Sequence, residues 1–184
     1  MESLMIVILV IIIIVCAISV LSAITYNKFQ DYIIRINEVE SIIDSNLRNK
    51  YDLINRAIPI IKTNIDDKED KDIFGEIVKL RSRKIGNFEL YRVLIDASNE
   101  LNGLKEKYPK IKDSDEMKKI ISQIDDIDLK VDNSIGYYND NITIYNSLLK
   151  KFPSNIIATF CKYKERLFFD RKDMTDEDYE DFKL

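Results

Sequence analysis

Residues 117–152 read MKKIISQIDDIDLKVDNSIGYYNDNITIYNSLLKKF, and this stretch decides the fold class. Apolar residues recur in it at steps of three and four, which is the spacing of one face of an α-helix. The stripe consists of Met117, Ile120, Ile124, Ile127, Val131, Ile135, Tyr138, Ile142, Tyr145, Leu149 and Phe152. Since most of the other positions are polar, the stretch predicts a long amphipathic helix with one buried face.

A second stripe of the same spacing precedes it and predicts another long helix. It consists of Ile36, Val39, Ile43, Leu47, Tyr51, Ile54, Ile58, Ile61 and Ile65. Pro59 lies inside this stripe, where it removes one backbone hydrogen bond. We expect a kink there rather than a domain boundary.

A further helix is expected between these two, after an acidic turn at residues 66–72. Its stripe consists of Ile73, Phe74, Val78, Ile85, Phe88, Tyr91, Ile95, Leu101 and Leu104. Tyr108 and Pro109 should end it, because the residue before a proline avoids the helical region. Ser114 can then cap the helix of residues 117–152.

Pro153 is expected to stop that helix and to stand in the first turn of a short fourth one of about four turns. The apolar residues of the fourth helix are Ile156, Ile157, Phe160 and Tyr163. Residues 170–184 are mainly acidic, so we expect a mobile tail. Four glycines and three prolines are too few for an all-β chain. The fold class is therefore all-α, an antiparallel bundle of three long helices plus a short fourth.

The N-terminal run from Leu4 to Ala23 is apolar and uncharged. About 20 helical residues at about 1.5 Å each match a hydrocarbon core of roughly 30 Å. A cleaved signal peptide would need a basic start and a shorter run, so a retained transmembrane helix is favoured. We expect three regions: an anchor at 1–25, a helical bundle at 26–169 and the tail at 170–184.

Charges around this run indicate the orientation. Lys28 and Arg35 follow it, whereas Glu2 alone precedes it, and positive residues favour the cytoplasmic side. We therefore expect a single-pass protein of the cell membrane with its N-terminus outside and its bundle in the cytoplasm. A disulfide between Cys16 and Cys161 is not expected, because Cys16 would lie within the bilayer.

Several short motifs resemble the LemA family. Tyr137-Tyr138-Asn139-Asp140, Tyr145-Asn146, Lys151-Phe152-Pro153-Ser154-Asn155 and Phe168-Phe169 look like its C-terminal signature, and Leu47-Arg48-Asn49-Lys50-Tyr51-Asp52-Leu53-Ile54 is similar to its RRYDLI stretch. The matching positions are Tyr26, Asn27, Arg48, Tyr51, Asp52, Leu53, Tyr108, Pro109, Tyr138, Asn139, Asp140, Tyr145, Asn146, Phe152, Pro153, Ser154 and Asn155. The resemblance implies an antiparallel bundle on one N-terminal span and carries over no catalytic residue, so we read these positions as structural.

The chain departs from the family pattern at three places. Asn55 stands where the family usually has proline after DLI, and Ile135 stands where it commonly has arginine. The histidine-glutamate pair often seen after the first bundle helix is missing, because the chain has no histidine.

Composition excludes the commonest enzyme designs. Without histidine there is no Ser-His or Cys-His pair and no zinc site of the usual kind, and no phosphate-binding glycine loop is present. We therefore expect no catalytic activity and no cofactor. The competing hypothesis is a metal-dependent enzyme that uses Asp125, Asp128 and Asp132, which lie at helical steps on one face. Those carboxylates also suit the solvated side of an amphipathic helix.

Tyr138 and Tyr145 lie seven residues apart and point in nearly the same direction on a helix. We expect them to be buried, with Asn139 and Asn146 forming hydrogen bonds between helices; the alternative is an exposed groove for a peptide. The net charge of −4 argues against nucleic-acid binding. The sequence thus predicts a membrane-tethered interaction or scaffold protein with a protein partner or self-association. An envelope-stress element is a third reading.

Overall fold

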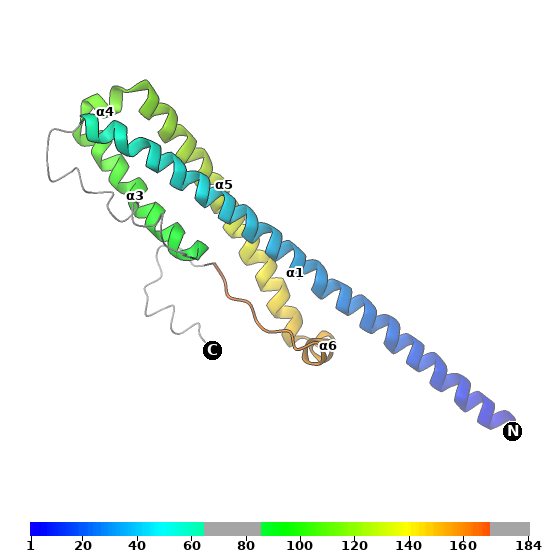
Figure 1. The fold of residues 1–184 in the computed structure, drawn as a ribbon. Coiled ribbons are helices and arrows are strands. Elements are labelled where there is room, and N and C mark those ends of the chain that lie inside the picture. Colours follow the sequence, from blue (N-terminus) through cyan, green and yellow to red (C-terminus); the bar gives the residue numbers. More distant parts are fainter. Residues whose placement is uncertain (65–85, 170–184) are drawn as a thin grey trace. The chain divides into compact units, whose positions relative to one another are not determined.

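The structure, a computed structural model, describes residues 1–64 and 86–169 (Figure 1). All regular elements within these two ranges are helices, which confirms the all-α fold class. They are α1 (Glu2–Asn64), α3 (Asn87–Lys107), α4 (Pro109–Asp113), α5 (Asp115–Lys150) and α6 (Ser154–Phe160). The expected acidic turn, the start of the second bundle helix and the expected mobile tail lie outside the described residues.

Helix α1 is one continuous element that contains both the apolar N-terminal run and the first bundle stripe. It continues through Pro59 to Asn64, so no domain boundary falls at the proline. The side chains of Thr63 and Asn64 donate to the carbonyl oxygens of Pro59 and Ile60 at 2.9 and 2.8 Å. Both are local bonds from a side chain to the carbonyl one turn earlier, a pattern that Thr and Asn side chains adopt within helices.

The chain forms two compact units. Unit 1 consists of Met1–Glu38 and Tyr138–Phe168, and unit 2 consists of Val39–Tyr137 and Phe169–Leu184. Both α1 and α5 contribute residues to each unit: α1 is divided after Glu38 and α5 after Tyr137. The two units are described separately below.

Unit 2 contains most of the buried residues of the two long stripes. Ile43, Leu47, Ile54 and Ile61 of α1 are almost fully buried, as are Met117, Ile120, Ile124 and Val131 of α5. The predicted burial of these faces is confirmed except at Tyr51 and Ile127, which are only partly buried, and Ile65 lies outside the described residues. Within this unit the two helices run in opposite directions (Figure 1).

The buried face of α3 agrees with the predicted stripe at Leu101 and Leu104 but differs from it in the N-terminal half of the helix. The buried residues are Leu90, Leu94, Ala97, Leu101 and Leu104, which also follow steps of three and four. The prediction was wrong for Phe88, Tyr91 and Ile95, which are only partly buried. The rings of Phe88 and Tyr91 instead lie edge-on to Phe169, with centroids 6.0 and 5.5 Å away. The prediction chose the face with the large aromatic residues, whereas the structure buries the face with the leucines.

The connection between α3 and α5 contains a short helix that was not predicted. Helix α3 ends at Lys107, as expected from Tyr108 and Pro109, but Pro109 then opens α4, and Ile111 in it is fully buried. Proline suits a first helical position because its φ is already helical. The predicted cap of α5 is confirmed, since the Met117 N–H donates to Ser114 Oγ at 3.4 Å.

Unit 1 has its own apolar core, formed by α1, α5, α6 and the segment after α6. Its buried members are Phe29, Ile36, Ile142, Tyr145 and Ala158. Phe29 is completely buried, and its ring lies edge-on to Tyr145 at 5.8 Å and tilted to Tyr163 at 5.0 Å. The stripe predicted from sequence began at Ile36 and so missed Phe29, which is completely buried in this core.

Helix α6 differs from the predicted fourth helix in length and in face. It has seven residues, and Pro153 is its N-cap rather than a residue of its first turn. Ser154 and Ala158 are buried, whereas Phe152, Ile156 and Phe160 are exposed, so the predicted burial of these three was wrong. The small side chains allow α6 to lie close to the core, and the large ones consequently point outward.

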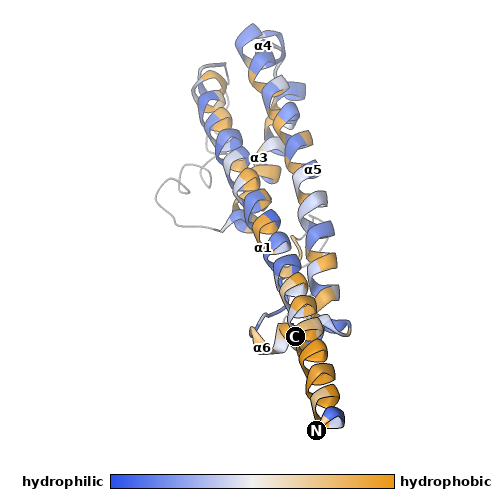
Figure 2. Ribbon diagram, turned by 90° about the vertical axis from the view of Figure 1, so that its right-hand side faces the viewer, coloured by the Kyte–Doolittle hydropathy of each residue, from blue (hydrophilic) through white to orange (hydrophobic). Residues whose placement is uncertain are grey.

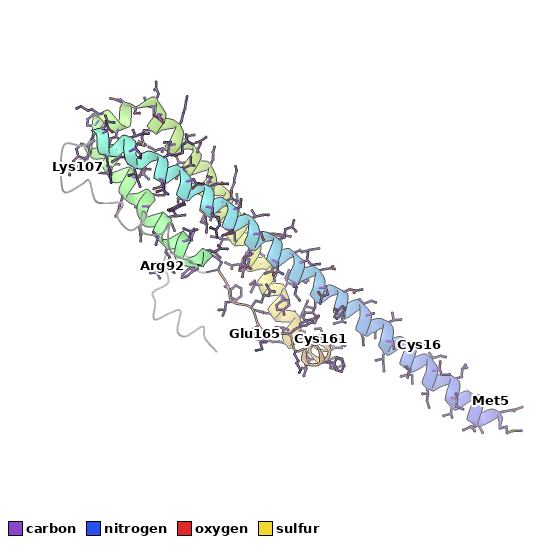
Figure 3. The ribbon with its side chains drawn as sticks, viewed as in Figure 1. Met5, Cys16, Arg92, Lys107, Cys161 and Glu165 are labelled. Atoms are coloured by element: carbon purple, nitrogen blue, oxygen red, sulfur yellow. The ribbon has the colours of Figure 1, made fainter. Side chains whose placement is uncertain are left out.

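The N-terminal part of α1 has no cover. All side chains of residues 1–21 are exposed, and the apolar run is the one stretch in the described ranges long and apolar enough to cross a membrane (Figure 2). Cys16 in this run and Cys161 after α6 are both free thiols, as expected, and Figure 3 shows them well apart. The run therefore meets the length and composition expected of an anchor.

Candidate functional site

The asparagine of the Tyr145-Asn146 motif fastens the segment that follows α6. Asn146 Nδ2 donates to the Arg166 carbonyl oxygen at 2.8 Å, and Asn146 Oδ1 accepts from the Arg166 N–H at 3.0 Å. The Arg166 guanidinium in turn donates to Asn37 Oδ1 of α1 at 2.7 Å. Asn146 was expected to form a hydrogen bond between helices, but it forms two hydrogen bonds with the backbone of Arg166 instead. This pairing needs a donor and an acceptor on one side chain, which an amide provides.

The tyrosines of this region are parts of the core. Tyr145 is 2% exposed, and desolvation by burial raises its pKa above the usual 10.0, partly opposed by the Arg166 guanidinium. Burial likewise raises the pKa of Tyr163, whose hydroxyl accepts a hydrogen bond from Gln30 Nε2 at 2.6 Å that opposes the rise. Tyr138 packs against the same core. Burial of the tyrosines favours the structural reading over an exposed peptide groove.

The Pro153-Ser154-Asn155 motif closes the turn between α5 and α6. Ser154 is buried, and its Oγ lies 2.6 Å from the Leu148 carbonyl oxygen and 2.8 Å from that of Lys151. Its hydroxyl therefore caps the end of α5. Among the described residues, Asn155 Oδ1 is buried with no hydrogen-bond partner.

The remaining motif positions are divided between the two units. Tyr26, Asn27 and Asp140 are exposed, Asn139 is partly buried, and Tyr108 and Pro109 form the break between α3 and α4. In unit 2, Arg48 and Asp44 form an exposed ion pair at 2.9 Å one helical turn apart. The Asp44 carboxylate raises the pKa of Arg48. Such exposed pairs contribute little to stability.

Lys50, within the stretch from Leu47 to Ile54, is a buried lysine that the sequence analysis did not predict. Lys50 is 2% exposed, and its Nζ lies 2.6 Å from Asp128 Oδ1 of α5. Its position at a three-residue step after Leu47, on the edge of the predicted stripe, was the available signal. Burial of a charge is costly unless it is paired, so Asp128 is the partner that allows Lys50 to be there.

This pair bears on the metal hypothesis. Asp128 binds the Lys50 ammonium, and Asp125 and Asp132 are exposed on α5. No group of three acidic, histidine or cysteine residues in the described part of the chain is placed to hold a metal ion. The structure therefore does not assemble the three aspartates into a common site.

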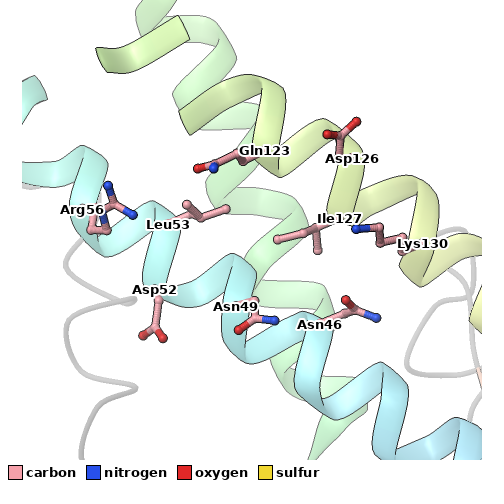
Figure 4. Close-up of a pocket in the computed structure, with 9 residues that line it drawn as sticks. All are labelled: Asn46, Asn49, Asp52, Leu53, Arg56, Gln123, Asp126, Ile127 and Lys130. Carbon is pink, nitrogen blue, oxygen red and sulfur yellow. The ribbon is translucent and has the colours of Figure 1, made fainter. Parts of the chain in front are cut away.

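A groove of about 500 Å³ lies in unit 2 between α1 and α5 (Figure 4). Figure 4 shows Leu53 and Ile127 pointing toward one another from the two helices. The other lining residues are polar: Asn46, Asn49, Asp52, Arg56, Gln123, Asp126 and Lys130. Amides and charges of both signs can bind the backbone and polar side chains of a peptide, and these lining residues include no serine, cysteine or histidine.

Loss of the Asn146 side chain should free the segment after α6. In Asn146→Ala, two hydrogen bonds worth about 1 kcal/mol each disappear, so trypsin should cut at Lys162, Lys164 and Arg166 faster than in the unchanged chain. Limited proteolysis of the detergent-solubilised protein measures this. Asn133→Ala, an exposed position on the same helix, is the control. Equal cutting rates in the two variants would contradict the role assigned to Asn146.

Removal of the Asp128 charge should destabilise the protein. Asp128→Asn leaves the Lys50 ammonium buried and poorly paired, which should cost roughly 3 kcal/mol, the low end for such pairs because Asp128 is partly exposed. Urea unfolding followed by circular dichroism measures it. Asp125→Asn should stay within about 0.5 kcal/mol. If Mg²⁺ or Ca²⁺ stabilised the unchanged chain and neither variant, the three aspartates would after all form a cation site.

Alkaline pH should weaken unit 1 through Tyr145. Its pKa is raised in the folded state, so its contribution is complete below about pH 10 and is lost as the pH rises through the folded-state pKa. The urea concentration at the unfolding midpoint should fall as the pH is raised from about 9 to about 11. The midpoint of Tyr145→Phe should fall by less over the same range. The exposed Tyr137→Phe serves as the control. A fall of the same size in all three proteins would show that Tyr145 titrates normally.

The LemA family model matches residues 39–180. A comparison with curated proteins gives no match. The matched range contains the motif positions from Arg48 to Asn155, whereas Tyr26 and Asn27 precede it.

Proposed function

This chain belongs to the LemA family, and from that premise we propose that it is a single-pass, membrane-anchored interaction module without catalytic activity. The observation that carries the proposal is the uncovered apolar run of α1, which continues without a break into the helices of the bundle. An apolar helix of this length is costly to expose to water and stable in hydrocarbon. We therefore assign the run to the cell membrane.

Three features support a non-enzymatic role. The chain has no histidine, so proton transfer near neutral pH would depend on carboxylates, lysines or tyrosines. The buried Lys50 is held by Asp128, and Tyr145 and Tyr163 belong to an apolar core. Tyr145, Asn146 and Ser154 of the family motifs thus have structural explanations in this chain.

The groove between α1 and α5 is our candidate contact surface. Its walls carry amides and charges of both signs over the apolar pair Leu53 and Ile127, which suits a polar peptide segment of a protein partner or of a second copy. Asp52 and Leu53 belong to the family motif, and both line this groove. A function in binding would explain why motif residues lie at its surface.

Topology can be tested with one engineered thiol. We propose that the bundle is cytoplasmic, because Lys28 and Arg35 follow the run. In a Cys161→Ser background, Lys118→Cys places a thiol on an exposed side chain of α5. The chain should stay in the membrane pellet after an alkaline wash, and a membrane-impermeant maleimide should label it only in permeabilised cells. Release by the wash would refute the anchor, and labelling of intact cells would reverse the orientation.

Photocrosslinking can test the groove. A photoreactive amino acid replacing Gln123, which lines the groove, should give discrete crosslinked products in membranes, either with one partner or with a differently tagged copy of the chain. The same replacement at Asp132, exposed on α5 but not lining the groove, is the control. Absence of products at Gln123, or identical products at both positions, would count against a binding role for this surface.

A further inference from the structure

Helix α6 turns its large apolar side chains outward. Phe152, Ile156 and Phe160 are 80, 58 and 87% exposed, and we call these three side chains the outer face of α6. Ile156 and Phe160 lie one helical turn apart on one side of α6, and Phe152 lies in the turn just before the helix, while Ser154 and Ala158 are buried. A cluster of large apolar side chains in water indicates an interaction surface rather than a core.

The outer face lies close to the end of the apolar run. Ala158 of α6 shares the core of unit 1 with Phe29, and Tyr163, just after α6, packs on the Phe29 ring at 5.0 Å. Phe29 follows Ala23, the last residue of the run, by about six residues, which is roughly 9 Å of helix. The headgroup layer on each side of a bilayer is roughly 5–7 Å thick. Helix α6 is thus attached to α1 at about the outer edge of the headgroup layer.

Burial along α1 supports the same depth. Residues 1–21 are all exposed, Ser22 and Thr25 are partly buried, and Phe29 is completely buried. Other parts of unit 1 therefore begin to pack on α1 within the last turn of the apolar run, so no spacer separates the run from the core of unit 1. In Figure 2, α6 lies beside α1 near the place where its continuous hydrophobic colouring ends.

Basic residues flank the outer face in the sequence. Lys151, Lys162 and Lys164 are exposed, and Lys150 forms an ion pair with Glu165 at 2.8 Å. Apolar side chains accompanied by lysines are typical of helices that lie in the interface of a membrane. Anionic headgroups attract such lysines. The composition around α6 therefore suits a lipid surface.

We propose that the outer face of α6 is a second membrane contact, inserted at the headgroup boundary of the leaflet from which α1 emerges. This inference rests on the proposed anchoring by α1. Lipid is the occupant that the position requires, because a spanning run holds α6 near the bilayer. Contact at both the run and α6 would restrict rotation of unit 1 about the α1 axis, and the anchor alone would allow that rotation.

The absence of tryptophan allows a direct test, since one introduced tryptophan is the sole strong fluorophore. We would place it by Phe160→Trp in the outer face, by Ile12→Trp in the run, and by Leu129→Trp at an exposed position of α5 in unit 2. Each full-length variant is reconstituted into phosphatidylcholine and phosphatidylglycerol vesicles with or without brominated acyl chains. Bromine quenches a tryptophan that reaches the acyl region.

Phe160→Trp and Ile12→Trp should both lose emission in brominated vesicles, and Leu129→Trp should keep it. Quenching of Ile12→Trp alone would overturn the contact by α6 and leave the anchor intact. Quenching of neither would overturn the anchor and the α6 contact together. A blue-shifted but unquenched Phe160→Trp would show that protein rather than lipid covers α6, which also overturns the proposal. Lowering the protein-to-lipid ratio then distinguishes the two kinds of cover. A blue shift that is lost on dilution indicates a second copy, and one that persists indicates a segment of the same chain.

Discussion

The packing of Tyr145 and Tyr163 on the completely buried Phe29 ring is the interaction on which unit 1 depends. It joins three parts of the chain that are distant in sequence: α1, α5 and the segment after α6. Because aromatic rings bury large areas and prefer edge-on or offset contacts, this cluster restricts how the three parts can meet. The polar bonds of Asn146 and Gln30 surround it and determine the position of the C-terminal segment.

Continuity of α1 has a functional consequence within unit 1. Its apolar run and Phe29 belong to the same helix, with no loop between them. In the proposed anchoring, this direct connection would place the first core residue at a defined height above the bilayer, whereas a flexible linker would not. The small residues of α6 then allow close packing at that height, and its large residues remain outside. Position and composition together make α6 a candidate for contact with lipid.

The family motifs acquire physical meanings that a motif alone does not express. Asn146 and Ser154 pair with backbone groups, which explains the need for an amide and a hydroxyl at these positions. Tyr145 contributes apolar area to a core. Asp52 and Leu53, by contrast, line a groove in unit 2. The motif residues thus serve several local purposes rather than one shared reaction centre.

Much of the fold could be predicted from sequence, because helical periodicity is local. The stripes of α1 and α5, the stop at Pro109 and the cap at Ser114 follow from residue spacing and backbone chemistry, as does the length of the apolar run. The buried face of α3, the outward face of α6 and the pairing of Lys50 with Asp128 depend on which segments meet in space. Periodicity shows that a helix has two faces, but a neighbouring element decides which one is covered, and only the tertiary structure supplies that neighbour.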